Sequence, residues 1–141
     1  MPKLNKDFFI GNEVLFVGYS SKNQTFSKSI YGAFADNGIK VYPYSTRTDG
    51  KYDVKVYHNL DEIEKIPATA FVLLNREHAR DAVQMLSKKG VKRILFQGKK
   101  VVDLETLAAC KDLGIEAVVA CPMMIFGKGL HRLHAFFAGV R

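Results

Sequence analysis

A segment near the N-terminus gathers residue types that bind anions. It follows the apolar run 14–17, opens with Gly18, and carries several hydroxyl groups and two lysines around the start of a predicted helix. Backbone N–H groups and the helix dipole attract negative charge at such a place, so the segment predicts a phosphate site. The candidate binding residues here are Gly18, Tyr19, Ser20, Ser21, Lys22, Asn23, Ser27 and Lys28. Neither GxGxxG nor GxxxxGK[ST] is present, so a polar connection with Ser27 as helix N-cap stays open.

A second group of candidates stands at the end of the next predicted strand, where the chain reads Tyr44, Ser45, Thr46 and Arg47. A site for NAD uses Asp or Glu at this position to hold the ribose hydroxyls. Arginine among hydroxyl groups instead suits a phosphorylated ribose, which both NADP and coenzyme A (CoA) carry. The alternative is that Arg47 is a solvated surface residue.

Polar groups also follow the later apolar runs. Asn75 and Arg76 follow the third, Gln97 follows the fourth and Cys121 follows the fifth. Asn75 is alternatively a helix cap and Arg76 a surface residue of the first turn. Cys121 either meets a bound group or is a small buried hydrophobe.

Other chemistries find little support in the sequence. His131 and His134 share a helix face and could join Cys121 around a metal, but ligand spacing and carboxylate support are missing. No Ser-His-Asp order, GxSxG elbow or acid/base pair is found. For an enzyme that uses NADP or an acyl-CoA, Cys121 is the candidate nucleophile.

The elements that position these residues alternate regularly. Apolar runs at 14–17, 40–44, 70–74, 91–96 and 117–119 predict strands, and their continuous hydrophobicity is typical of a parallel sheet covered on both faces. Helices are predicted between them, with caps at Ser27, Asn59 and Asn75, followed by a helix from Asp103 to Leu113 and a last helix at 130–137. Asn59 and Glu62 predict a capping box for a short helix that ends before Pro67. The order predicts an α/β fold, a three-layer Rossmann-like sandwich with a mainly parallel five-stranded sheet, whose ligands bind at the carboxyl ends of the strands.

Composition limits the choice further. The chain has 141 residues, 48% hydrophobic and 25% charged, which predicts a single domain over residues 1–141 with 123–141 as a C-terminal helical extension. A net charge of +7 favours an anionic partner. Two distant cysteines favour a reducing, cytoplasmic setting, and no apolar run is long enough for a transmembrane helix.

The terminal stretch 126–137 is basic on one side and aromatic on the other. Such a stripe is usually docked on the sheet or on a partner subunit, so we expect no nucleic acid or membrane as partner, and a homodimer is one expectation. A third hypothesis is therefore an interaction module with a vestigial pocket.

Several short pieces of sequence, in this order and spacing, resemble the small single-domain CoA-binding proteins from about Glu13 to Pro122. The pieces are Val17–Ser20, Gly38–Pro43, Val56–Ile63, Leu73–Arg76, Gly90–Lys92, Phe96–Gly98 and Cys121-Pro122. The family's Rossmann-like fold looks like the CoA-binding domain of the succinyl-CoA synthetase alpha subunit.

The resemblance assigns roles to three regions. It implies that residues 18–27 wrap the pyrophosphate of CoA, that Ser45 to Arg47 approach the 3′-phosphate, and that Leu74 to Arg76 line the adenine and ribose. It also implies binding as a sensor, carrier or regulator rather than a complete enzyme. The chain departs from the family pattern at Ser45-Thr46, Asn75, Leu95 and Val119-Ala120.

Overall fold

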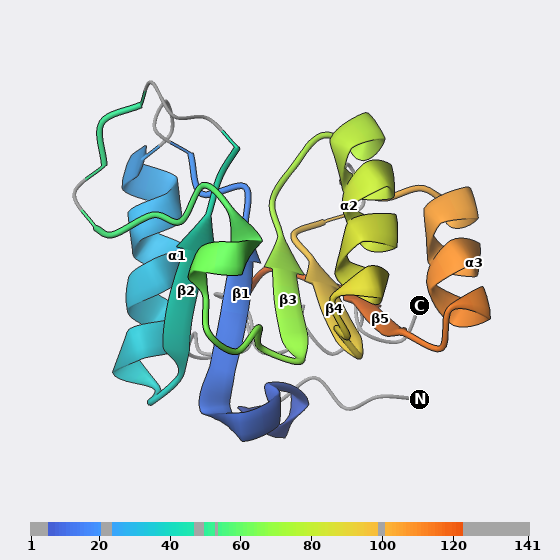
Figure 1. The fold of residues 1–141 in the computed structure, drawn as a ribbon, viewed down its shortest axis with the longest axis horizontal. Helices are drawn as coiled ribbons and strands as arrows, with labels where there is room; N and C mark the ends of the chain where they lie inside the picture. Colours follow the sequence, from blue (N-terminus) through green and yellow to red (C-terminus); the bar gives the residue numbers. More distant parts are fainter. Residues whose placement is uncertain (1–5, 21–23, 47–49, 53, 99–100, 123–141) are drawn as a thin grey trace.

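Five parallel strands form one sheet in the computed structural model, which describes residues 6–20, 24–46, 50–52, 54–98 and 101–122. The order across the sheet is β2-β1-β3-β4-β5 (Figure 1). The strands are β1 (Glu13–Val17), β2 (Lys40–Tyr44), β3 (Thr69–Val72), β4 (Arg93–Phe96) and β5 (Glu116–Val119). The predicted fold class is confirmed, and the sheet is entirely parallel.

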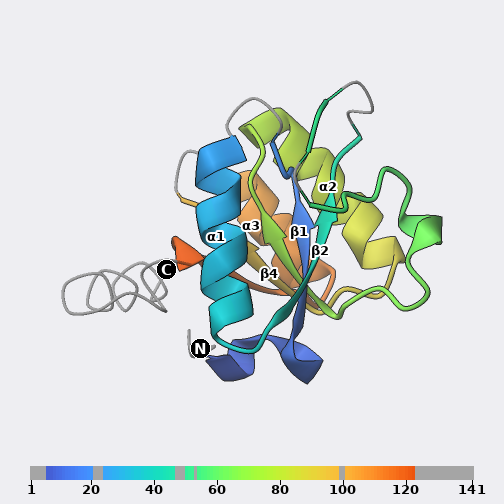
Figure 2. The same cartoon turned by 90° about the vertical axis from the view of Figure 1, so that its left-hand side faces the viewer.

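Three helices cover the two faces of the sheet. α1 (Gln24–Asp36) packs on one face through Ile30 and Phe34, and α2 (Arg76–Lys88) and α3 (Leu104–Asp112) pack on the other. Figure 2 shows α1 and α2 on opposite sides of the sheet. Because both faces are covered, successive residues of a central strand are buried alternately in the two cores, which explains the continuous apolar runs.

The predicted cap at Asn75 is confirmed, the cap predicted at Ser27 is wrong, and the helix predicted from Asp103 begins one residue later with Asp103 as its cap. The side chains of Asn75 and Asp103 accept hydrogen bonds from the backbone N–H groups of His78 (2.9 Å) and Thr106 (2.8 Å). Ser27 is not an N-cap, because α1 already begins at Gln24 and places Ser27 inside the helix, fully buried.

The short helix after Asn59 is smaller than predicted. It is a single 3₁₀ turn, Leu60–Glu62, so it ends at Glu62 instead of continuing to Pro67. The predicted capping box is present, with Asn59 and Glu62 bonded to each other's backbone. The next residue, Ile63, is extended and buried, so core packing ends the helix after one turn.

A segment that the sequence analysis did not predict covers the amino ends of the strands. Two 3₁₀ turns, Lys6–Phe8 and Ile10–Asn12, precede β1 and bury Phe8 and Phe9. The hydroxyl of Thr69 donates to the carbonyl of Phe8 (3.2 Å) and accepts from the N–H of Ile10 (3.1 Å). Arg93 donates to the carbonyls of Asp7 (3.0 Å) and Phe8 (3.1 Å), so β3 and β4 both hold this segment.

The predicted extension 123–141 and its helix lie outside the described residues. Within the part of the chain that the structure describes, no helix is long and apolar enough to cross a membrane.

Candidate functional site

The turn after β1 lies where the strand order reverses, between β1 and β3. Gly18 has a φ of +95°, a left-handed conformation that favours glycine. A Cβ atom at this position would overlap the carbonyl oxygen of Leu73 and lie 2.7 Å from Cδ2 of Leu74. Hydrogen bonds fix the same backbone: the N–H groups of Gly18 and Tyr19 donate to the carbonyl of Tyr44 (2.9 and 3.3 Å). The chain therefore leaves β1 along a path that only glycine permits.

The loop between β1 and α1 is anchored from within the helix. The backbone N–H of Ser20 donates to Oγ of the buried Ser27 (3.1 Å). Tyr19 is fully buried, and its ring meets those of Phe16 (5.1 Å between centroids) and Tyr52 (6.2 Å). The side chain of Tyr19 is thus part of the core.

Of the other candidates in this loop, one is exposed and three lie outside the part of the chain that the structure describes. Lys28 is exposed on the first turns of α1. Ser21, Lys22 and Asn23 lie outside the described residues.

Tyr52, Tyr57 and His58 contact the carboxyl end of β2, an arrangement that the sequence did not predict. Backbone hydrogen bonds run from Ser45 N–H to the carbonyl of Tyr57 (3.0 Å) and from Tyr57 N–H to the carbonyl of Pro43 (2.8 Å). Nδ1 of His58 lies 2.8 Å from the carbonyl oxygen of Ser45, and the hydroxyl of Tyr52 donates to Oγ of Ser45 (3.3 Å). Ser45 is therefore held on both its backbone and its hydroxyl.

Of the other residues proposed at this strand end, Tyr44 is buried and Arg47 lies outside the described residues. Burial raises the pKa of the Tyr44 phenol above its ordinary value. Tyr57 and His58 belong to the motif Val56–Ile63, so their place beside Ser45 is the one part of this arrangement that the sequence could have suggested.

Four candidates lie at the ends of β3 and β4. Asn75 uses its side-chain oxygen as the N-cap of α2, Leu74 is half-buried, and Arg76 is exposed in the first turn of α2. The N–H of Gln97 donates to the carbonyl of Val72 (3.1 Å), which places it beside β3. Its Oε1 atom is buried and has no hydrogen-bond partner among the described residues. A buried acceptor without a partner is uncommon in folded proteins, and here it stands at the carboxyl edge of the sheet.

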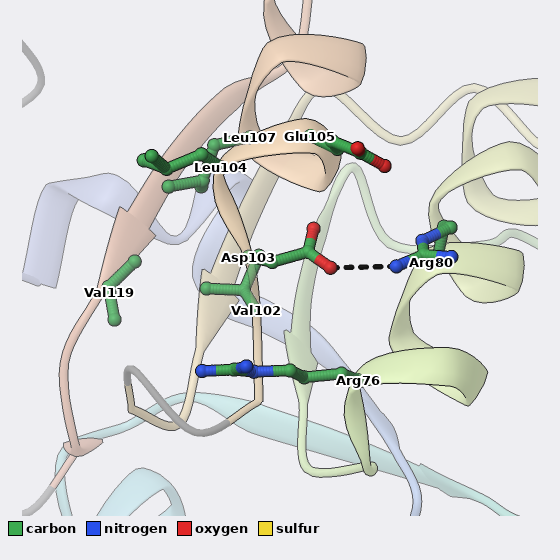
Figure 3. A pocket seen from close by; sticks show the side chains of 8 residues that line it. All are labelled: Arg76, Arg80, Val102, Asp103, Leu104, Glu105, Leu107 and Val119. Atoms are coloured by element: carbon green, nitrogen blue, oxygen red, sulfur yellow. Dashed lines mark hydrogen bonds and ion pairs between the residues drawn. The ribbon is translucent and has the colours of Figure 1, made fainter.

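A pocket of about 630 Å³ opens between the N-terminal ends of α2 and α3 (Figure 3). Its apolar lining residues are Val102, Leu104, Leu107 and Val119, and its charged ones are Arg76, Arg80, Asp103 and Glu105. Of these, only Arg76 was a candidate from the sequence. Arg80 and Asp103 are 23 residues apart, and nothing in the sequence signals that they meet.

The charged wall of this pocket is an ion pair. Nη2 of Arg80 lies 2.7 Å from Oδ2 of Asp103. The other oxygen of Asp103 accepts from the hydroxyl of Thr106 (2.7 Å) and from its backbone N–H. These hydrogen bonds, together with the Arg80 guanidinium, hold the pKa of Asp103 well below its usual range, so the carboxylate is charged at neutral pH.

The two cysteines differ in surroundings. Cys121 follows β5, is half-buried, and packs against the core beneath α1. Cys110 is buried in α3, where burial raises the pKa of its thiol to about 11. No group of three or more His, Cys, Asp or Glu residues within the described ranges could hold a metal ion, and His131 and His134 lie outside them.

The fold and this edge define a class. A parallel sheet in the order β2-β1-β3-β4-β5, with helix N-termini and a glycine turn at one edge, is that of the Rossmann-like, doubly wound α/β proteins. A family model described as "CoA binding domain" matches residues 12–127. The chain belongs to this family of CoA-binding domains.

Solved structures agree with the fold. One similar chain is Prb, described as the PH1109 protein redesigned for binding, with 21% identity and a TM-score of 0.70 over 89% of this chain and 91% of that one. A conserved hypothetical protein from Pyrococcus furiosus has 16% identity and a TM-score of 0.65 over 86% and 97%. A Thermus thermophilus protein has 14% identity and a TM-score of 0.67 over 81% and 86%. No curated protein matches the sequence.

Proposed function

We propose that the chain binds CoA or an acyl-CoA at the carboxyl edge of the sheet and acts as a sensor, carrier or regulatory protein. The observation that carries the proposal is the turn at Gly18. A Cβ there would collide with the backbone of Leu73, so only glycine allows the path by which the chain leaves β1 at the strand-order reversal and leads to the N-terminus of α1, and helix N-termini at this place attract phosphates. The family match supports CoA as the ligand.

The proposed roles follow the position of each residue. The pyrophosphate would lie on the loop 18–23 and the first turn of α1, within reach of Lys28. Ser20 and Ser27 support this loop through their hydrogen bond. Gln97 offers a buried acceptor to a donor group of the ligand.

The remaining roles rest on the resemblance. Tyr44 and Ser45 flank the place proposed for the ribose, and Arg47 is proposed to pair with the 3′-phosphate. Leu74 to Arg76 are proposed to line the adenine and its ribose.

The test is isothermal titration of the full chain with CoA, dephospho-CoA, NADP and NAD at two salt concentrations. We expect CoA to bind most tightly, and its affinity to fall at high salt because phosphates and lysines attract each other. In Arg47→Ala, CoA should lose about tenfold or more in affinity while dephospho-CoA is almost unchanged, because only CoA carries the 3′-phosphate.

Lys40→Ala is the matched control, since Lys40 is an exposed cation at the amino end of β2, on the opposite edge of the sheet. It should leave both affinities unchanged. Equal losses for CoA and dephospho-CoA in Arg47→Ala contradict the role of Arg47. No binding of CoA by the unmodified chain contradicts the proposed function.

NADP addresses the second hypothesis. Cys121 follows β5 at the same edge of the sheet, where it could act as the nucleophile of an enzyme that uses NADP. The titration with NADP therefore also tests this hypothesis. Tighter binding of NADP than of CoA would favour that hypothesis over the proposal.

A further inference from the structure

The pocket between α2 and α3 lies at the same edge of the sheet as the proposed CoA site and adjoins it at Arg76, a residue proposed to stand beside the adenine and its ribose that also lines the pocket. Its lining comes from the first turns of α2, the connection after β4, the start of α3 and the end of β5. We propose that this pocket receives the acyl group of a CoA thioester and that it selects uncharged acyl chains. The inference rests on the proposed function and names the substrate class of that site.

The distance between the two places suits one ligand. The strand order puts the gap between β4 and β5 two strand spacings from the gap between β1 and β3, about 10 Å. The pantetheine arm of CoA contains two amide units with short carbon segments and resembles about four residues of extended chain, which span roughly 13 Å. A CoA molecule with its pyrophosphate on the turn at Gly18 can therefore bring its thioester to the mouth of the pocket.

The inner surface of the pocket suits a hydrocarbon chain. Val102 and Val119 are buried, with 5% and 6% of their surfaces exposed, and Leu107 is half-buried. Leu104 stands at the rim with 84% of its surface exposed. An acyl chain in the pocket would cover apolar surface on Leu104 that water now contacts, and this burial favours longer chains.

The charges around the pocket argue against an anionic acyl group. Arg80 is paired with Asp103 at 2.7 Å, so neither offers a separate charge to the ligand. The remaining charged lining residues, Arg76 and Glu105, are of opposite sign, and the four formal charges sum to zero. The free carboxylate of a dicarboxylic acyl group would lose its hydration in this pocket, and no net positive charge would compensate for that loss.

The test is a chain-length series, measured by isothermal titration with CoA, acetyl-CoA, butyryl-CoA, hexanoyl-CoA and succinyl-CoA. We expect the affinity of the unmodified chain to rise about two- to fourfold for each methylene group between acetyl and hexanoyl. Succinyl-CoA should bind less tightly than butyryl-CoA, which has the same number of acyl carbons.

Leu104→Asn should at least halve the gain per methylene while the affinity for free CoA stays within twofold. Leu104 is so exposed that this change does not threaten the core. The matched control is Leu113→Asn, because Leu113 is an exposed leucine just after the opposite end of α3 and lies away from the pocket. It should alter neither the gain nor the affinity for CoA.

Each other outcome is decisive. A flat chain-length series with measurable CoA binding overturns the acyl pocket and leaves the proposed function standing. Tighter binding of succinyl-CoA than of butyryl-CoA, or equal effects of the two leucine variants, also overturns it. If neither CoA nor any thioester binds, the proposed function and the acyl pocket fail together.

Discussion

The two halves of the carboxyl edge are built in different ways. Around β1, β2 and β3 the backbone itself is bound, through Gly18, Ser45 and Leu73, whose N–H groups all donate to carbonyls of neighbouring segments. Around β4 and β5 a side-chain ion pair between Arg80 and Asp103 joins the two helices, and a pocket opens beside it. A rigid turn that leads to the N-terminus of a helix suits a phosphate group, whereas a space with apolar walls suits an apolar part of the ligand.

The difference also predicts how each half responds to mutation. Where backbone atoms are in close contact, a single added methyl group clashes with its neighbours. Where side chains at the surface form the wall, a substitution changes the local contacts and leaves the chain path intact. The following three changes test this contrast, from the largest expected effect to the smallest.

Gly18→Ala should lower the free energy of unfolding by about 3 kcal/mol or more, because alanine disfavours a φ of +95° and its Cβ overlaps the Leu73 carbonyl. Chemical denaturation measures this loss. Gly90→Ala is the matched control: Gly90 has a φ of +87°, but no atom lies within 4 Å of a Cβ built there. It should cost only about 1 kcal/mol of conformational strain. Similar losses in both variants would mean that the turn at Gly18 is not tightly packed.

Ser27→Ala should lower the free energy of unfolding by about 1 kcal/mol, because the backbone N–H of Ser20 loses its acceptor in a buried place. The affinity for CoA should fall as well, since this bond holds the proposed phosphate loop. Ser29→Ala is the matched control on the same helix: its hydroxyl donates to the carbonyl of Thr25 (3.0 Å) at an exposed position. If both variants bind CoA equally well, the Ser20–Ser27 bond does not support the loop.

Asp103→Asn tests the half with the ion pair. At neutral pH we expect it to lower the free energy of unfolding less than either of the two changes above. Asparagine also caps helices, so the substitution mainly removes the charge that Arg80 and Thr106 stabilise. A carboxyl whose pKa is lowered in the folded state adds stability above its unfolded pKa, near 4, and loses it as the pH falls towards the folded value.

Urea unfolding of Asp103→Asn and of the unmodified chain at several pH values measures this contribution. The stability difference between the two should be constant from pH 7 to about 5 and shrink below about 4. A difference that grows on acidification would contradict the charge as its source.

The fold was predictable because its causes are local. Continuous apolar runs such as Val14 to Val17 indicate burial on both faces, and Asn59 and Asn75 are good caps whatever lies around them. Ser27 shows the limit of this reasoning. Serine favours caps, but here the helix begins three residues earlier and the hydroxyl serves a neighbouring loop from a buried position.

The candidate site was predictable only in part. Strand ends could be found from apolar runs, so Gly18, Ser45 and Gln97 were placed at the correct edge. The pocket, the contacts of Tyr52 and His58 with Ser45 and the core position of Tyr19 depend on segments that meet only after folding. No local preference of the chain encodes such meetings.

The hydrogen bonds from Arg93 to the carbonyls of Asp7 and Phe8 join parts of the chain that are 86 and 85 residues apart. A ribosome makes residues 7 and 8 long before it makes residue 93. The segment before β1 therefore lacks these bonds until residue 93 has been synthesised. Phe8 and Phe9, which the folded protein buries, can contact other chains during that time. Among the hydrogen bonds of this segment, those from Arg93 can form only after β4 has been synthesised, so the segment lacks them while β1, β2 and β3 are made.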